Sequence, residues 1–310
     1  LVFVVAVAQA SSNLHHGIAE AHFSEAISGY ILAFFAIWWA WMNLTWFASA
    51  YDVDDVPYRL LVFLQLTGAI IFAAGVPSFV EGDRAITIGG YAVMRLVMVV
   101  QWLRAGRSDP PRRTTAHRYA LGIGLAQVLW VLSLFIPFWQ LGITIALIIA
   151  ELLVPVWAEQ AEPTTWHPHH IAERYGLFTI IVLGESILSL SLGFRSVLEA
   201  GEFSPVLVGI VAGGLLILFC LWWVYFDWPM HHSLTSFGGA FLWGYGHYFI
   251  FAAAVGAGLA VEIDYATHHS EISAVAAGAA VAIPVAIYLT LLWLLFGAYK
   301  NPSFLQRFLI

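Results

Sequence analysis

Ten apolar runs, most of them about 20 residues long, constrain this chain more than any other feature of its sequence. A helix needs about 20 residues to cross the hydrocarbon core of a bilayer. Because backbone polar groups cannot stay unpaired in lipid, spanning segments must be helices or strands of a closed barrel. Barrel strands alternate polar and apolar residues over about 10 residues, whereas these runs are apolar on all sides. The sequence therefore predicts an all-α fold, a polytopic transmembrane helical bundle.

The composition supports the same class of protein. Of the 310 residues, 61% are hydrophobic and 10% are charged, whereas soluble domains carry roughly 25% charged residues. No basic arm or aromatic-rich basic patch indicates nucleic acid as a partner. The single cysteine, Cys220, lies in an apolar run, so it forms no disulfide within the chain. Membrane lipid is the partner that the composition predicts.

The chain begins inside an apolar run, which we interpret as the remnant of a longer helix. A tight turn at Pro137-Phe138-Trp139 leaves two alternatives for the fifth and sixth runs, which are either two spans or one re-entrant hairpin. The expected spans are Leu1–Ala10, Ser28–Ser49, Leu60–Val76, Ala85–Leu103, Ala120–Pro137, Phe138–Trp157, Ile171–Leu192, Pro205–Phe226, Phe237–Val261 and Ile272–Ala298.

The basic residues of the loops predict the orientation. The loop at 104–118 carries five arginines, whereas the opposite side of the expected bundle carries only Arg84 and Arg195. Positively charged loops stay in the cytoplasm. We therefore expect a multi-pass protein of the bacterial cytoplasmic (inner) membrane, with the loop at 104–118 and both ends of this chain on the cytoplasmic side.

Two stretches of the chain match each other and indicate an internal repeat. The two Trp-Trp pairs, Trp38-Trp39 and Trp222-Trp223, lie at matching places in the second and eighth runs. The repeat would be a parallel six-helix unit, with one copy at 1–158 and an incomplete copy at 171–310 that lacks about two C-terminal helices. In this alignment the second copy carries the ionisable member of each polar pair: Gln9 and Glu185, Gln65 and His247, Asn43 and Asp227.

Glu185 is the strongest candidate for a functional residue. A charge inside the bilayer is costly, so intramembrane carboxylates commonly have a function. Ser189 lies four residues further and shares its helical face, and Gly184 is expected to let a neighbouring helix approach closely. Glu185 is either a carboxylate that binds protons or cations, or a structural residue kept neutral or paired within the bundle.

His247 and Arg95 also lie in the middle of apolar runs. A histidine can relay protons, although a lone buried histidine is more often a hydrogen-bonded packing residue. Arg95 keeps its charge and needs a carboxylate partner, for which Glu185, Glu151 and Asp227 are candidates. A structural ion pair is the simpler interpretation of Arg95. Glu151 lies near the expected end of its span, where it would reach the membrane interface.

Two histidine-rich clusters lie on the predicted outer side. His15 and His16 accompany one group of carboxylates, and His268 and His269 accompany another. Nitrogen and oxygen ligands of this kind suit zinc. Solvated loop histidines are more common, so these four are weak candidates for a metal site, and no cofactor is expected.

Four stretches carry a resemblance to a known family. The most specific is Ala172–Ser186, with Glu-Arg-Tyr-Gly-Leu-Phe followed by Gly-Glu-Ser; the others are Leu1–Gln9, Trp38–Trp41 with Asp54-Asp55, and Arg95 followed by Trp102-Leu103-Arg104. These stretches resemble the bacterial low-temperature requirement protein A family. The resemblance implies a bacterial integral membrane protein linked to growth in the cold, and it implies no particular substrate.

We hypothesise that the chain is an ion or proton-coupled solute transporter or channel that can form a homodimer, with a polar site between its two repeats. That site would contain Glu185, His247, Arg95, Gln9, Gln65, Ser189 and Asp227. One alternative is a membrane-embedded lipid-modifying enzyme linked to cold or stress adaptation, although no recognisable catalytic spacing surrounds Asp227 and the histidines that follow it. Another alternative is a non-catalytic membrane sensor, which would need no polar path.

Overall fold

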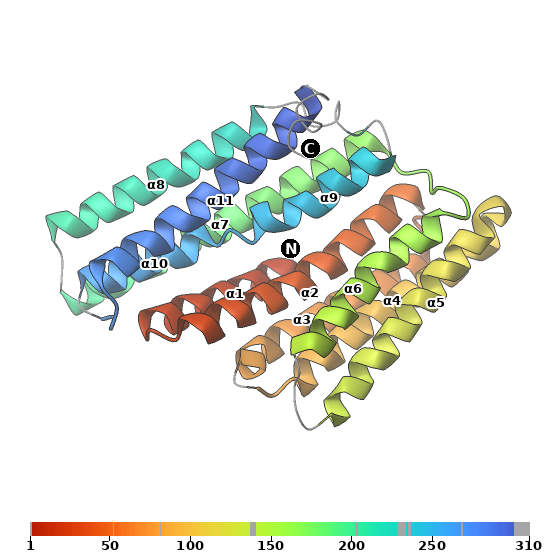
Figure 1. Cartoon of the computed structure of the whole chain (residues 1–310), viewed down its shortest axis with the longest axis horizontal. Helices are drawn as coiled ribbons and strands as arrows, with labels where there is room; N and C mark the ends of the chain where they lie inside the picture. The colour runs from red at the N-terminus through yellow and green to blue at the C-terminus, as the bar shows by residue number, and fades with distance from the viewer. Residues whose placement is uncertain are drawn as a thin grey trace. The chain divides into compact units, whose positions relative to one another are not determined.

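The structure is a computed structural model, and it describes residues 2–51, 53–80, 82–136, 141–201, 204–227, 234, 237–267 and 269–300. The regular elements among these residues are all helices (Figure 1), so the all-α prediction is confirmed. The α-helices are α1 (Val2–Ala19), α2 (Phe23–Ala50), α3 (Val56–Val80), α4 (Ala85–Ser108), α5 (Arg113–Leu132), α6 (Leu141–Glu159), α7 (Pro168–Ala200), α8 (Pro205–Phe226), α9 (Phe237–Phe251), α10 (Val255–Ala266) and α11 (Ala274–Lys300). Short 3₁₀ helices lie at Pro110–Arg112 and Ser133–Phe135.

The described part of the chain contains nine segments long and apolar enough to cross a membrane. One of them, Gly238–Ala266, combines α9 and α10. Helix α1 runs as far as Ala19, well beyond the expected end of its apolar run, and it is not among the nine. The predicted polytopic bundle is confirmed, with nine spans where ten runs were expected. The turn at 137–140 lies outside the described residues, while the helices on either side of it, α5 and α6, each qualify as a span.

The bounds of α8 show how local chemistry starts a helix. Ser204 is its N-cap, and the Ser204 hydroxyl accepts a hydrogen bond from the backbone N–H of Leu207. Pro205 follows at the first helical position, where a missing N–H costs nothing and the fixed φ favours the helix. The expected span, Pro205–Phe226, is therefore the observed helix.

The chain divides into two compact units. Unit 1 contains Val7–Phe35 and Pro168–Ile310, and unit 2 contains Val2–Ala6 and Ala36–His167. This division groups helices by contact and does not test the proposed sequence repeat, which stays a prediction.

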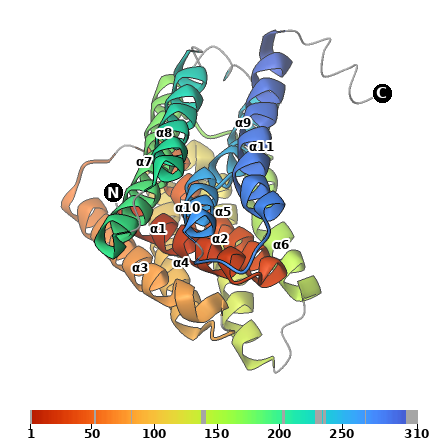
Figure 2. The same ribbon diagram turned by 90° about the vertical axis from the view of Figure 1, so that its left-hand side faces the viewer.

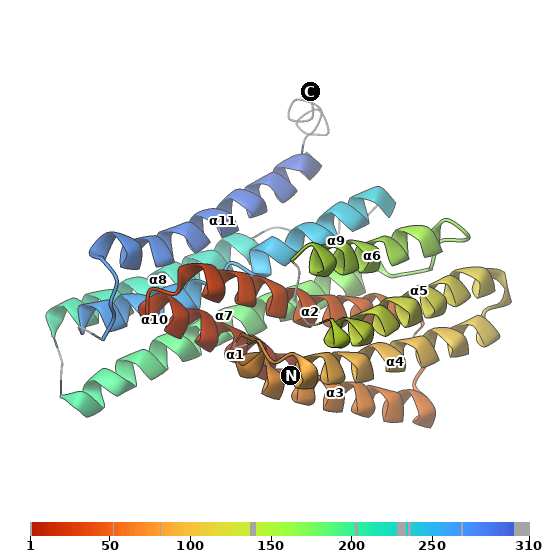
Figure 3. The same cartoon turned by 60° about the horizontal axis from the view of Figure 1, so that its bottom comes forward.

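Unit 2 is built from consecutive helices that pack on their neighbours, α3 on α4, α4 on α5 and α5 on α6 (Figure 3). Glycines set the closest approach. A Cβ atom at Gly75 would lie 2.6 Å from the backbone nitrogen of Thr87, and one at Gly68 would lie 2.9 Å from Met94. Small residues of this kind let membrane helices pack backbone to backbone.

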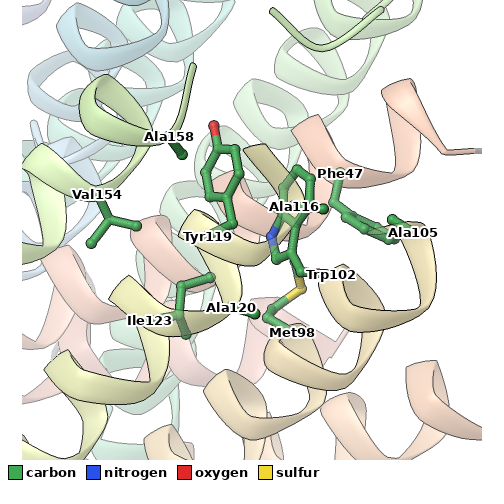
Figure 4. Close-up of a cluster of buried hydrophobic side chains, with 10 residues drawn as sticks. All are labelled: Phe47, Met98, Trp102, Ala105, Ala116, Tyr119, Ala120, Ile123, Val154 and Ala158. Carbon is green, nitrogen blue, oxygen red and sulfur yellow. The ribbon is translucent and has the colours of Figure 1, made fainter. Parts of the chain in front are cut away.

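A cluster of ten buried side chains forms the apolar core of unit 2 at one end (Figure 4). At its centre the ring of Trp102 on α4 stacks on Tyr119 of α5, with 3.9 Å between ring centroids and 5° between ring planes. Phe47 of α2 packs edge-on against the same indole at 4.9 Å. These contacts fix the register of α4 against α5.

Unit 1 is organised around α7, which packs against α8 and α10 (Figure 2). Helix α11 packs against both α9 and α10. A Cβ atom at Gly246 would lie 2.7 Å from the side chain of Leu295, so α9 and α11 are in close contact. The ninth expected span, Phe237–Val261, is not continuous: α9 ends at Phe251, and α10 begins at Val255.

Candidate functional site

Glu185 lies on α7 and is 4% exposed. The Ser189 hydroxyl, one turn further along α7, donates a hydrogen bond to Glu185 Oε1 at 2.6 Å. The buried Ser11 side chain of α1 lies near the carboxylate without forming a hydrogen bond. The Tyr30 side chain of α2 lies close enough to interact electrostatically with it. Among the residues that the structure describes, no lysine, arginine or histidine nitrogen lies within the 4.0 Å limit of an ion pair with Glu185.

The break between α9 and α10 lies beside this carboxylate. Ala254 has a φ of 34° and a ψ of 41°, in the left-handed region, which costs an ordinary residue roughly 1–2 kcal/mol. The residues of the break are packed inside the unit, with Phe251 1% exposed and Val255 4% exposed. A strained backbone at such a place persists only where the surrounding structure holds it.

Gly256 brings the start of α10 against α7. A Cβ atom at Gly256 would overlap the Cα of Ser186 and lie 2.9 Å from its hydroxyl oxygen. The expectation that Gly184 allows the close approach was wrong, because nothing lies within 4 Å of a Cβ atom placed there. Gly184 points away from the helix contact, whereas the next two residues, Glu185 and Ser186, are buried.

His247 is fully buried on α9. Its Nδ1 lies 2.7 Å from the carbonyl oxygen of Trp243, and its Nε2 has no hydrogen-bond partner. The ring centroids of Trp243, Tyr175 and Tyr225 lie 4.2, 5.1 and 5.9 Å from that of the imidazole. The carbonyl contact fixes the proton on Nδ1, because a carbonyl can only accept.

Glu185 and His247 belong to two different levels of unit 1. Tyr175, which contacts His247, precedes Glu185 by ten residues on α7, which corresponds to about 15 Å along a helix axis. Gly256 contacts Ser186 at the other level. The structure therefore does not bring Glu185 and His247 into direct contact, and a relay between them would require intervening groups or water.

Arg95 forms its ion pair with Glu151, one of the three partners that the sequence left open. Arg95 Nη2 lies 3.1 Å from Glu151 Oε2, and the two side chains are 1% and 0% exposed. The Tyr91 hydroxyl donates to Glu151 Oε2 at 2.7 Å, and Trp130 Nε1 donates to Oε1 at 3.1 Å. Arg95 and Glu151 lie in unit 2 and Glu185 in unit 1, so coupling between Arg95 and Glu185 stays a prediction.

The expectation that Glu151 reaches the membrane interface was wrong. Helix α6 covers Leu141–Glu159, which places Glu151 near its middle. The span was expected to start and end earlier, at Phe138 and Trp157. Burial of Glu151 is made possible by the three donors that surround its carboxylate.

The remaining predicted site residues are scattered. Gln65 on α3 is 1% exposed, and neither atom of its amide has a partner. Ser189 is partly buried beside Glu185, whereas Gln9 on α1 is exposed. Asp227 is exposed at the C-terminal end of α8.

Within the described residues, a direct contact joins the two histidine-rich clusters. His15 Nε2 lies 2.6 Å from Asp264 Oδ2, and the two side chains are partly buried. The ring of His16 lies beside that of His15, with 4.7 Å between centroids and 33° between ring planes. His269 Nδ1 lies 3.0 Å from the Thr267 hydroxyl. His268 lies outside the described residues. Within the described residues, no group of three or more potential metal ligands occurs.

Sequence reasoning did not identify Tyr91 and Trp130 as partners of Glu151, or Ser11 as a neighbour of Glu185. Helical spacing offered a signal for Tyr91, which precedes Arg95 by one turn. Trp130 and Ser11 come from other helices than the groups they contact, so only the packing of the helices reveals them.

Comparisons with known proteins identify the family. The profile described as bacterial low temperature requirement A protein (LtrA) matches residues 1–310. An uncharacterized protein of Rhizobium meliloti (strain 1021) is 29% identical over 236 residues, which cover 73% of this chain and 56% of that relative. The chain thus spans little more than half the length of this relative. No solved structure matches the chain. The chain belongs to the bacterial low temperature requirement A protein family of multi-pass membrane proteins.

Proposed function

We propose that this protein moves protons or small monovalent cations across the membrane, alone or coupled to a solute, with Glu185 as the group that binds and releases them. The observation that carries this proposal is a buried carboxylate, 4% exposed, with the Ser189 hydroxyl as its hydrogen-bond partner and no basic partner among the described residues. An ionised carboxylate buried without a counter-charge is very costly. Glu185 must therefore hold a proton or a cation.

The broken span supports a transport role for this position. Transporters commonly place substrate and ion sites at discontinuous membrane helices, where helix ends supply partial charges. The N-terminus of α10 lies against Ser186, next to Glu185, and carries the partial positive charge of a helix dipole. The carbonyl groups at the end of α9 can bind a cation or water. Partial charges of this kind stabilise the ionised carboxylate and leave it free to bind a proton or a cation. An arginine would instead form a permanent ion pair with it.

The oxygen atoms around Glu185 suit a proton or a small hard cation. The Ser189 hydroxyl contacts the carboxylate, and the Ser11 hydroxyl lies nearby on another helix without a hydrogen-bond partner. Oxygen ligands are those that hard cations prefer. His247, at the other level of unit 1, would be a second station reached through water or intervening side chains.

The test is flux in proteoliposomes that contain the full chain. Flux of H⁺, Li⁺, Na⁺ and K⁺ is measured separately for wild type, Glu185→Gln and Ser189→Ala. Glu185→Gln should abolish flux of the conducted ion, because the amide keeps the shape and loses the charge. Ser189→Ala should retain flux with a weaker apparent affinity. Equal flux of every ion in wild type and Glu185→Gln contradicts the proposal.

A further inference from the structure

A set of buried polar side chains lies at one level of unit 2 and is not used by the proposed function. Tyr91 of α4 contacts Trp130 of α5, with 6.3 Å between centroids. Arg95 lies one turn from Tyr91 along α4, in the direction of Trp102. Gln127 lies one turn from Trp130 along α5, in the direction of Tyr119, which stacks on Trp102. Arg95 and Gln127 are therefore at the same height of the α4–α5 hairpin.

The neighbouring helices add two residues at this height. Glu151 of α6 accepts the hydrogen bond from Trp130. On α3, Gly68 faces Met94, the residue before Arg95, and Gln65 lies one turn before Gly68. We call Gln65, Arg95, Gln127 and Glu151 the mid-layer of unit 2; all four side chains are at most 3% exposed.

The mid-layer has more free donors than free acceptors. Neither the Gln65 nor the Gln127 amide has a hydrogen-bond partner. The Nε and Nη1 nitrogens of Arg95 lack one as well, and Nη2 has only its 3.1 Å ion-pair contact with Glu151. The Glu151 carboxylate already receives the Tyr91 hydroxyl and the Trp130 indole N–H, besides its contact with Arg95. Buried polar groups in native proteins almost always form hydrogen bonds, and a buried donor or acceptor left without a partner costs about 1–3 kcal/mol. A ligand that accepts hydrogen bonds would satisfy these donors.

The charges indicate what that ligand is. Arg95 meets Glu151 through one nitrogen–oxygen contact of 3.1 Å, so the guanidinium fork is not used in the two-bond geometry that it forms with carboxylates. Tyr91 and Trp130 share in balancing the charge of Glu151, which leaves the positive charge of Arg95 partly uncompensated. We propose that the mid-layer binds a small monoanion with oxygen acceptors, such as a short carboxylate, through the Arg95 fork and the amides of Gln65 and Gln127.

Thermal unfolding of the full chain in nanodiscs tests this site with formate as the probe. Sodium formate is titrated against sodium gluconate at constant ionic strength, because gluconate is a carboxylate too bulky for a helix-packed layer. Formate should raise the Tm of the wild type saturably by several degrees, since a ligand that binds only the folded state stabilises it. A Tm that is the same in both salts overturns the proposal, and would mean that water rather than an anion satisfies the polar groups of the mid-layer.

Variants locate the effect. The double substitution Arg95→Gln with Glu151→Gln removes both charges and leaves neither unpaired, and it should abolish the formate shift. Gln127→Leu should weaken the apparent formate affinity at least about tenfold, the loss of about 1.4 kcal/mol expected for one hydrogen bond to an anion. Gln9→Leu, at an exposed position on α1, is the matched control and should keep the wild-type shift. If the double variant does not fold, the formate-induced Tm shifts of Gln65→Leu and Gln127→Leu test the proposal instead. A formate shift unchanged in both of them overturns the proposal.

The site is independent of Glu185. Glu185→Gln should keep the formate shift while losing cation flux, so failure of one proposal does not imply failure of the other.

Discussion

Gly256 on α10 contacts the backbone of Ser186 on α7, immediately beside Glu185. This contact ties the broken span to the helix that carries the buried carboxylate. The left-handed conformation of Ala254 turns the chain just before the contact. The arrangement places a helix start, with its free N–H groups, next to the one carboxylate of α7 that is buried among the described residues.

Substitution of Gly256 tests the importance of this contact. Gly256→Ala should destabilise the protein by about 1–3 kcal/mol, the usual range for overpacking, because the added methyl group meets the Ser186 backbone, which cannot rotate away. The measurement is the free energy of unfolding in mixed micelles, with cation flux as a second readout. Gly184→Ala is the control: nothing lies within 4 Å of its added Cβ atom, and alanine favours a helix. Equal stability of the two variants would show that α10 does not press on α7.

The buried pair of Arg95 and Glu151 predicts a non-additive effect. Arg95→Ala or Glu151→Leu alone should cost about 3–5 kcal/mol, because each leaves a charge buried without its partner. The double substitution should cost much less than the sum of the two. Arg195→Ala, which removes an exposed pair with Glu199, should change stability little. Additive losses from the two single substitutions would contradict the ion pair.

The sequence predicted the fold class and most helices, since long apolar runs permit few alternatives in lipid. It did not predict the break in the ninth span. Ala252, Ala253 and Ala254 are good helix formers, and nothing local marks an interruption. The break follows from tertiary packing, in which Gly256 meets Ser186 and a Cβ atom at Gly258 would overlap the backbone of Ala280.

The candidate site was predicted in part. A charge in an apolar run identified Glu185 and Arg95 as buried, and both are. The partner of Arg95 could not be chosen from the sequence, because Glu185, Glu151 and Asp227 were all possible by composition. The choice depends on helix packing: α4, α5 and α6 are consecutive neighbours, which brings Glu151 to Arg95. A helix that extends two residues further than expected was enough to misplace Glu151 at the interface.

The loop between α2 and α3 predicts a pH dependence of stability. The backbone N–H of Tyr58 and the guanidinium of Arg104 lower the pKa of Asp55, and Arg59 lowers the pKa of Asp54. A depressed folded-state pKa contributes stability above the unfolded value, about 4 for aspartate, and that stability is lost as the pH falls through the folded-state value. The Tm difference between wild type and Asp55→Asn should therefore be constant from pH 7 to 5 and shrink below about pH 4. A difference that persists unchanged to pH 3 would contradict this linkage.

The orientation in the membrane can be tested by cysteine labelling. Cys220 is the single cysteine and is exposed, so the background is Cys220→Ala. In intact cells an impermeant maleimide should label Glu199→Cys and spare Arg107→Cys, because the arginine-rich loop is predicted to be cytoplasmic. Both positions are exposed in the structure, and both should react after permeabilisation. Labelling of position 107 in intact cells would reverse the orientation.

The role of Glu185 in cation transport is tested most directly by comparing the acidification of proteoliposomes that contain wild type or Glu185→Gln. A potassium gradient with valinomycin sets the membrane potential, and a trapped dye reports the internal pH. Glu199→Gln, an exposed position on the same helix, is the matched control, and Na⁺ or Li⁺ flux is measured in parallel. We expect wild type and Glu199→Gln to transport protons, Na⁺ or Li⁺. Glu185→Gln should transport none of these ions while remaining folded. Glu185→Gln vesicles that conduct the same ion at the wild-type rate would contradict it.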